Sequence, residues 1–305
     1  MEQHSIEELN NYDAYHKGDN SFSAYARYLQ SKWRVRKGYP KQKNKLGNYL
    51  PVEFAKETKA NFLTNRIGNL VQSEVDKSKV LGSMISEPRI WNNLLSSQPL
   101  CFNLFGELHF DLDLATKVFQ ALFPNKISKV TDVKFEYSPG RGDKNYTGDH
   151  SAFDAFIEYD NEKAQSEYIG IEVKYSENMR QRREDSIKTY HKHKREYLKI
   201  AKSAGIFPES SIEILRESPL QQIWRDHLLS LATEKDYSGG FFIFLHPEQN
   251  KKCHEAYKDY IQLLNSSDPD ITKIYSITLE KFLDILFKLN SSTWVIELRE
   301  RYLGI

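Results

Sequence analysis

The residues best suited to chemistry lie in the stretch FDAFIEYDNEKAQSEYIGIEVKY, which runs from Phe153 to Tyr175. The stretch predicts two short strands joined by the loop NEKAQ, which has the length and polarity of a hairpin loop. If the loop is central, Asp154 faces Glu172 and Phe156 faces Gly170. Two carboxylates would then lie within roughly 5 Å of each other at Cβ.

Opposed carboxylates on neighbouring strands are unfavourable unless another charge neutralises them. Lys174 lies two residues after Glu172 on the same strand face and could neutralise part of this charge. A divalent cation bound by the carboxylate oxygens could neutralise the rest. The alternative is that these residues form the solvent face of a half-buried strand, which is what an E-x-K pattern usually marks. The residue pattern alone leaves both interpretations open.

A second candidate feature is a basic, aromatic segment near the N-terminus. The sequence RYLQSKWRVRKGYPKQKNK, residues 27–45, contains eight basic residues and no acidic one. Lysines and arginines interleaved with aromatic residues suit phosphates and bases, so Arg34, Arg36 and Lys37 are predicted to contact nucleic acid. The alternative is a basic amphipathic helix whose Trp33 packs on the core.

The composition is that of an ordinary globular protein. The chain has 305 residues, of which 39% are hydrophobic and 28% charged, and its net charge of +1 argues against indiscriminate polyanion binding. No apolar run approaches the ~20 residues of a membrane span, and the N-terminus has no hydrophobic signal region, so we expect a cytoplasmic protein without a membrane partner. Cys101 and Cys253 are isolated, so a thiolate zinc site is not expected and a disulfide framework is excluded.

The elements that must position the motif follow from hydrophobic periodicity. Residues 1–85 predict a helical, basic N-terminal extension, and residues 86–305 predict one compact domain. Within the domain, a helix ending at Pro124 precedes the strand VTDVKFEY, the hairpin, a charged helix near residues 186–203 and a helix opened by SPLQQIWRDHLLSLA. The buried strand GGFFIFLHP, the strand KIYSIT and two amphipathic helices complete the chain. This order predicts an α/β fold with a mixed sheet flanked by helices.

The motif D-x17-E-V-K, from Asp154 to Lys174 on the second and third strands of an αβββαβ order, resembles the PD-(D/E)xK nuclease superfamily. The phrases SSQPLCFNLFGEL, SAFDAFIEY, IEVKYSE and QQIWRDHLL resemble a group of prokaryotic restriction endonucleases within it. The resemblance covers about residues 91–247, and Phe153 stands where the family usually has proline. It implies a restriction-endonuclease-like core and a Mg²⁺-dependent deoxyribonuclease.

The resemblance also implies roles for individual residues. Asp154 and Glu172 would bind Mg²⁺, for which Mn²⁺ can substitute, and the carbonyl of Val173 would complete the protein ligands. Lys174 would orient or help deprotonate the attacking water and stabilise charge in the transition state. Glu107 resembles, by position, an acidic residue that many members contribute from the first core helix.

Other candidates near the motif have competing interpretations. Asp111 and Asp113 compete with Glu107, and capping of the next helix is the alternative for either aspartate. Gln221 and Arg225 are one helical turn apart and could face a phosphate together, or they could be a surface pair beside the core. His150 and Glu177 flank the motif, and we assign neither a role.

The leading prediction is therefore a metal-dependent nuclease that hydrolyses DNA phosphodiester bonds, of the restriction or DNA-repair endonuclease type. The alternative is a non-catalytic nucleic-acid-binding module on the same fold, and a third option is an α/β protein unrelated to nucleic acid. The sequence leaves open the choice between DNA and RNA, the strandedness of the target, endonuclease against exonuclease action, and the oligomeric state, with a homodimer as one option.

Overall fold

The structure is a computed structural model that describes residues 4–82, 85–177, 179 and 183–305. At its centre is one five-stranded mixed sheet whose spatial order follows the chain order. The first three strands pair antiparallel, and the third, fourth and fifth pair parallel. The strands are β1 (Lys129–Tyr137), β2 (Phe153–Asp160), β3 (Ser166–Val173), β4 (Gly240–His246) and β5 (Ile274–Thr278). The predicted α/β fold with a mixed sheet is confirmed.

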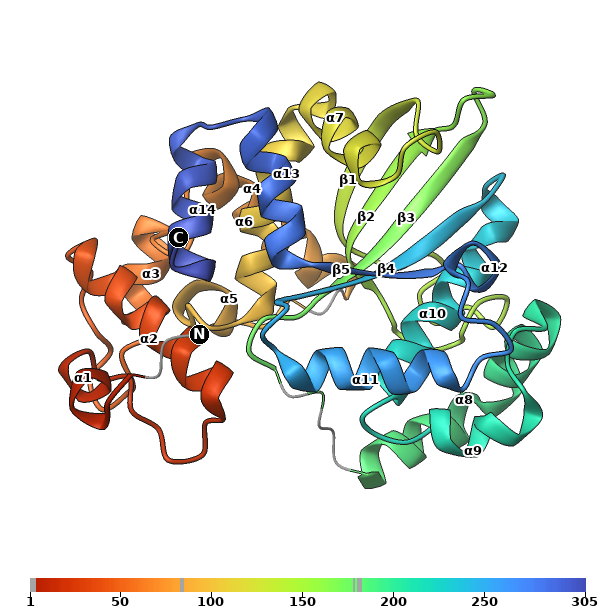
Figure 1. Ribbon diagram of the computed structural model, residues 1–305, viewed down its shortest axis with the longest axis horizontal. Coiled ribbons are helices and arrows are strands. Elements are labelled where there is room, and N and C mark those ends of the chain that lie inside the picture. The colour runs from red at the N-terminus through yellow and green to blue at the C-terminus, as the bar shows by residue number, and fades with distance from the viewer. Residues whose placement is uncertain (1–3, 83–84, 178, 180–182) are drawn as a thin grey trace.

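Helices cover both faces of this sheet, and the first three helices of the chain lie together to one side of it (Figure 1). The N-terminal helices are α1 (Ile6–Asn11), α2 (Ser21–Arg36), α3 (Val52–Thr58), α4 (Asn65–Leu81) and α5 (Arg89–Asn92). Before and after the hairpin come α6 (Ser97–Phe110), α7 (Leu112–Leu122), α8 (Arg183–Ala204), α9 (Ile212–Leu215) and α10 (Gln221–Thr233). The last are α11 (Lys251–Gln262), α12 (Pro269–Thr272), α13 (Leu279–Leu289) and α14 (Thr293–Leu303).

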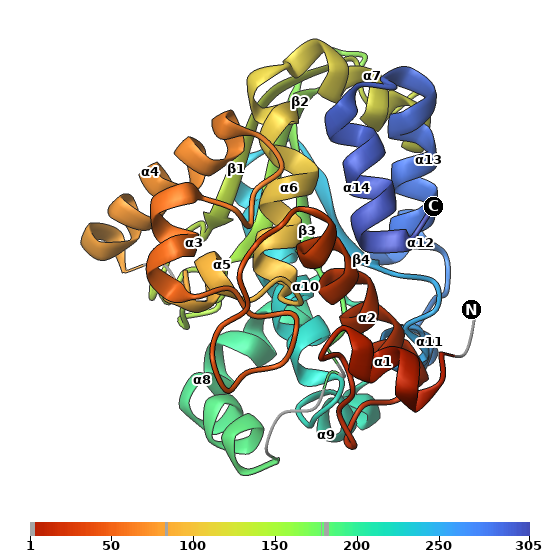
Figure 2. The ribbon, with the colours of Figure 1, turned by 90° about the vertical axis from the view of Figure 1, so that its left-hand side faces the viewer.

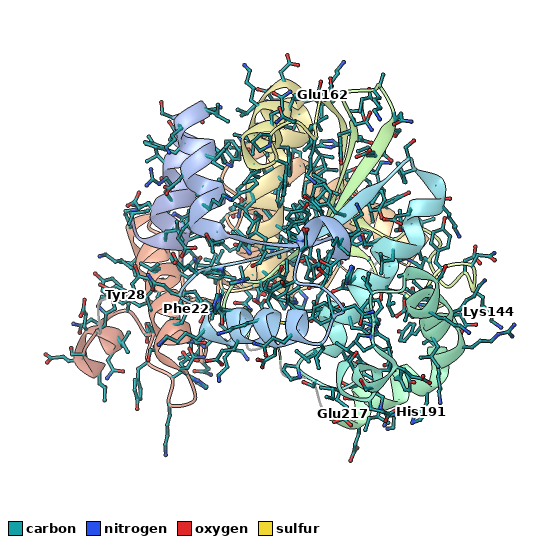
Figure 3. All side chains as sticks on the ribbon, turned by 45° about the vertical axis from the view of Figure 1, so that its right-hand side comes forward. Phe22, Tyr28, Lys144, Glu162, His191 and Glu217 are labelled. Atoms are coloured by element: carbon teal, nitrogen blue, oxygen red, sulfur yellow. The ribbon has the colours of Figure 1, made fainter. Side chains whose placement is uncertain are left out.

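The continuous apolar run in β4 explains why both faces are covered. Successive side chains of a strand point to opposite faces, and every residue of β4 is buried. Phe241, Ile243 and Leu245 enter the hydrophobic cluster shared with α6, α7, α13 and α14. Phe242 and Phe244 enter the second cluster, shared with α8, α10 and α11. Side chains fill the space between the sheet and its helices on both sides (Figure 3).

The N-terminal helices belong to the first of these clusters. Phe22 and Trp33 of α2 and Ile67 of α4 are buried together with Ile171 of β3 and Leu245 of β4. The same cluster includes residues of α14, which packs beside α2 (Figure 2). Residues before and after position 85 therefore share one hydrophobic core.

The hairpin of β2 and β3 has the predicted register. Phe156 pairs with Gly170, as a central loop requires. A Cβ at Gly170 would come within 2.4 Å of the ring of Phe153, so the glycine makes room for that ring. The loop of this hairpin, marked by Glu162 in Figure 3, lies at the far end of the sheet from the motif.

In the described part of the chain, no helix has the length and apolar character needed to cross a membrane.

Candidate active site

Three acidic residues lie in a row across β1, β2 and β3. The β1–β2 register pairs the two neighbours of Glu136 with the two neighbours of Asp154, so these acids face each other. The β2–β3 register pairs Ala155 with Ile171, and one step further along it sets Asp154 opposite Glu172. Strand pairing therefore concentrates negative charge at one end of the sheet.

The motif lysine is paired with one of these acids beneath α10. Glu172 and Lys174 are only 5% and 7% exposed. Lys174 Nζ donates to Glu172 Oε1 at 2.5 Å, and Gln222 Nε2 of α10 donates to the same oxygen at 2.5 Å. Because these side chains are buried, they do not form the solvated face of a strand, and that alternative is wrong.

The carboxylate of Asp154 is held by the neighbouring strand. Its Oδ2 accepts a hydrogen bond from the backbone N–H of Val173 at 2.8 Å. Burial raises the pKa of Asp154 well above its usual range, and the charges of Glu172 and Glu136 raise it further. Burial also raises the pKa of Glu136 to about 7, although a hydrogen bond from Gln98 opposes the shift. Burial is the larger cause of both pKa shifts, and the neighbouring carboxylates add to it.

Lys174 remains a cation in these surroundings. Burial alone would lower its pKa, but the charges of Glu172 and Asp154 outweigh burial and raise the pKa of Lys174 above its usual value. A protonated amine has three N–H donors and no lone pair, so it can contact an oxygen of a substrate or a water but cannot bind a metal.

Glu177 connects the motif to the first core helix. Its Oε1 accepts from the backbone N–H of Ser97 at 3.0 Å, and its Oε2 accepts from the backbone N–H of Tyr175 at 2.8 Å. Ser97 is the first residue of α6. Glu177 therefore fixes the chain just after β3 against the positive end of a helix, which suits its charge.

The residues that sequence reasoning missed are Glu136, Gln222 and Asp226. Asp226 lies one helical turn after Gln222 and is 5% exposed, and its Oδ2 has no hydrogen-bond partner among the described residues. Burial raises the pKa of Asp226 well above its usual range, and the charge of Glu172 adds to this. Two signals in the sequence pointed to Glu136 and Gln222. One is the glutamate next to last in the predicted strand VTDVKFEY, and the other is the second glutamine beside Gln221.

Glu107 lies away from the motif, near the end of α6. It accepts a hydrogen bond from Thr64 Oγ1 and pairs with Arg66 at 3.3 Å, so it joins α6 to the start of α4. Asp111 caps α7 by accepting from the backbone N–H of Leu114 at 2.9 Å. Among the described residues, Glu136 rather than Glu107 is the additional acid whose charge acts on Asp154.

Gln221 and Arg225 are also engaged inside the protein, each with different partners. Gln221 is buried and donates from Nε2 to the carbonyl of Ser186. Arg225 pairs with Asp149, with Nη2 at 2.8 Å from Oδ2, and donates from Nη2 to Ser151 Oγ at 2.9 Å. Gln222, the next residue, points toward the motif instead.

In the basic N-terminal segment, Trp33 is buried in the core, as the alternative interpretation of a packed amphipathic helix expects. Arg34 is buried and donates to the carbonyls of Gly47 and Tyr39 at 2.8 and 2.9 Å. Arg36 and Lys37 both pair with Glu297 of α14, at 3.4 and 2.7 Å. These cations therefore fasten α2 within the fold.

A cleft of about 520 Å³ opens where β3 ends. Lys174 and Gln222 lie on its inner side, the stretch from Gly18 to Arg27 forms one wall, and Lys252 of α11 lies on another. In Figure 1, α2 and α11 lie near this end of the strands. The cleft gives the motif lysine access to a ligand.

The donor set at the motif fits a hard divalent cation. In the described part of the chain, no group of three or more His, Cys, Asp or Glu side chains is placed to hold a metal ion. The candidate ligands are instead the two carboxylates of Asp154 and Glu172 with a backbone carbonyl, and Mg²⁺ takes only one or two carboxylates in many enzymes. The carboxylates of Glu136, Asp154 and Glu172 face one another across three strands, and a cation would offset their mutual repulsion, which supports the fit.

A mixed sheet with acids on its central strands and a lysine two residues beyond the second acid defines a nuclease-like α/β protein. The family model of the PD-(D/E)XK nuclease superfamily matches residues 17–304, and the chain belongs to this superfamily. No curated protein and no solved structure matches the chain.

Proposed function

We propose that the protein is a metal-dependent nuclease that hydrolyses phosphodiester bonds of DNA, as restriction and DNA-repair endonucleases do. The observation that carries the proposal is the row of Glu136, Asp154 and Glu172 across three strands, with Lys174 between the acids and an open cleft. Membership of the PD-(D/E)XK superfamily supports the nuclease class. Opposed carboxylates would repel a polyanion, so they have no use in a protein that only binds one.

In this proposal, Asp154 and Glu172 hold Mg²⁺ or Mn²⁺ together with the carbonyl of Val173. When bound, such an ion would supply Lewis-acid chemistry, lowering the pKa of water at the site and shielding the charge of the phosphate. The backbone N–H of Val173 orients Asp154, and Gln222 with Lys174 fixes the rotation of the Glu172 carboxylate. The carboxylate of Asp154 is thus held from β3, and that of Glu172 from Lys174 and from α10.

Lys174 supplies the positive charge that contacts the substrate. Its ammonium lies beside Glu172 at the inner side of the cleft, so it can turn a donor toward a phosphate oxygen or the attacking water. A buried cation placed before the reaction stabilises charge that develops on the phosphate without solvent reorganisation. Glu136 adds a third carboxylate that can accept the proton of the attacking water.

Incubation of purified protein with plasmid and linear DNA, in Mg²⁺, Mn²⁺ or EDTA, tests the proposal. We expect cleavage in either metal and none in EDTA. Binding of DNA without cleavage under any of these conditions would contradict the proposal and favour a non-catalytic module on the same fold. Formation of a homodimer stays a prediction of the sequence, and light scattering of the same sample would measure it.

A further inference from the structure

We infer that the substrate enters the active site as single-stranded DNA, through the cleft at the end of β3. We call this the entry cleft and define it by Asn20, Ser23, Leu95, Lys174, Gln222 and Lys252. The inference rests on the proposed function, because it concerns the strand that the same site would cut. Three properties of the cleft support it: its depth, its size and the fixed wall formed by α2.

The motif glutamate and lysine lie deep in the protein, whereas Asp154 and Glu136 are half-buried. Glu172 and Lys174 are 5% and 7% exposed, and α10 lies over them through Gln222. In the described part of the chain, Lys174 lines the entry cleft, so a phosphate can reach its ammonium there. In a duplex each phosphate is fixed to a wide helix, whereas a single strand can bend its backbone and present one phosphate.

The volume of the entry cleft suits one or two nucleotides. A cavity of about 520 Å³ lies within the range that encloses a small organic ligand and is roughly 8 Å across if taken as a cube. The major groove of B-DNA alone is about 12 Å wide, and the complete duplex is wider. A continuous duplex therefore cannot enter with both strands.

The wall formed by α2 is part of the core and cannot swing away as a free arm would. Phe22 packs edge-to-face on Tyr175, with ring centroids 6.2 Å apart, directly after β3. Gln30 Nε2 donates to the hydroxyl of Tyr175 at 3.2 Å and to the carbonyl of Arg301 at 3.0 Å. Opening the entry cleft for a duplex would require these buried contacts to break.

The charges around the entry cleft suit a phosphate backbone. Lys252 is exposed at one wall, where it pairs with Glu255 at 3.1 Å, and Lys174 lies at the inner side. The acids nearby are already engaged: Asp19 pairs with Arg27 through both carboxylate oxygens, at 2.7 and 2.9 Å, and Glu177 accepts from two backbone N–H groups. A strand that passes Lys252 on its way to Lys174 meets an ammonium group at both points, each beside one carboxylate partner that the phosphate would have to replace.

Binding without metal tests the inference separately from catalysis. Fluorescence anisotropy in EDTA would compare a labelled single strand, the same sequence as a blunt duplex, and that duplex with a single-stranded tail. We expect the single strand and the tailed duplex to bind at least about tenfold more tightly than the blunt duplex. Equal or tighter binding of the blunt duplex would overturn the inference.

Charge reversal at the wall locates the binding site. Lys252→Glu should weaken single-strand binding about tenfold, because it replaces attraction by repulsion at the entry cleft. Lys258→Glu is the matched control, since Lys258 is exposed on the same helix but does not line the entry cleft. Equal effects of the two changes would overturn the inference by showing that only net charge matters.

Cleavage then separates this inference from the proposed function. In Mg²⁺ we expect the tailed duplex to be cut in its tail and the blunt duplex to stay intact. Cleavage of the blunt duplex as fast as the single strand would contradict single-strand entry and leave the nuclease assignment standing. Selective single-strand binding without any cleavage would contradict the nuclease assignment and support the entry cleft as a binding site.

Discussion

The charged residues of the candidate site differ in how they affect the stability of the folded protein. The raised pKa values of Asp154 and Glu136 show that their negative charges are disfavoured in the folded protein. Glu172 differs, because it neutralises the buried ammonium of Lys174 at 2.5 Å. The two proposed metal ligands should therefore respond differently to mutation.

Replacement of Asp154 by asparagine should not destabilise the protein in EDTA at pH 8. The amide oxygen can keep the hydrogen bond from Val173 N–H while the opposed charge is removed, so we expect a free energy of unfolding equal to or roughly 1 kcal/mol above that of the wild type. Glu172→Ala should lower it by about 3 kcal/mol, since Lys174 would stay buried without its partner. Urea denaturation measures both, and a less stable Asp154→Asn with an unaffected Glu172→Ala would refute the assignment of charges.

Replacement of Lys174 should affect the rate rather than metal binding. A protonated lysine cannot bind a metal, so Lys174→Ala should keep Mg²⁺ binding while single-turnover cleavage falls by about 10³-fold. Lys174→Arg should recover little of the rate, because a planar guanidinium places its charge differently from a compact ammonium. Calorimetric Mg²⁺ titration beside the kinetics distinguishes the roles. Loss of metal binding in Lys174→Ala, or cleavage at the wild-type rate, would show the division of roles to be wrong.

Helix α2 shows how a sequence signal for nucleic acid can have a packing explanation. Arg34, Arg36 and Lys37 each have partners within the chain, and Glu297 lies about 260 residues further along the sequence. No local pattern reveals so distant a partner. The structure matches the alternative interpretation of this segment, in which Trp33 packs in the core.

The salt dependence of DNA binding should distinguish the two roles of α2. If Arg36 and Lys37 serve to pair with Glu297, changing both to glutamine should alter the slope of log K against log salt by less than about one unit. A fall of about two units would instead restore the prediction that they contact phosphates. Lys252→Gln provides the comparison, since its charge lies at the entry cleft.

Helix α10 carries a buried histidine that should make stability depend on pH. His227 contacts the hydroxyl of Tyr260 at 2.8 Å and the carbonyl of Thr272 at 2.7 Å, so it connects α10 to α11 and α12. Burial lowers the pKa of His227 to about 3. The unfolded chain binds a proton below about pH 6.5 while the folded chain does not, so the contribution of His227 to stability is lost as the pH falls from about 6.5.

Between pH 7 and pH 5.5, the wild type should lose about 1 kcal/mol more stability than His227→Gln, which cannot bind that proton. Urea denaturation at the two pH values measures the difference, and comparing pH dependence removes the intrinsic cost of the substitution. His191→Gln, at an exposed position of α8, is the matched control. The same pH dependence in wild type and His227→Gln would contradict a neutral buried ring.

The whole molecule shows which features follow from local pattern and which require the tertiary structure. The hairpin register and the buried strand β4 were predictable, because a short central loop fixes pairing and a continuous apolar run indicates a strand covered on both faces. The position of Glu136 was not, since fifteen residues, 138–152, separate β1 from β2 and their pairing cannot be counted from a short loop. Gln222 was missed because the rotation of α10 about its axis depends on how the helix packs.

The molecule also joins its two ends around the candidate site. Arg301 of α14 is fully buried and donates to Gln30 of α2 at 2.9 Å and to the carbonyl of Asn61 at 2.7 Å. Gln30 in turn contacts Tyr175, directly after the motif. The N-terminal helices and the last helix thus support the strand end that carries Lys174.

The most direct test of the central claim is Mg²⁺-dependent cleavage of labelled DNA by the wild type and by Asp154→Asn, with a matched change at an acid outside the site. Glu107→Gln is that control, because Glu107 pairs with Arg66 near the end of α6, whereas the motif contacts the start of that helix. We predict that the wild type and Glu107→Gln cut in Mg²⁺ and not in EDTA, and that Asp154→Asn cuts at least about 10³-fold more slowly while remaining folded. Cleavage by Asp154→Asn at the wild-type rate would contradict the assignment of the active site.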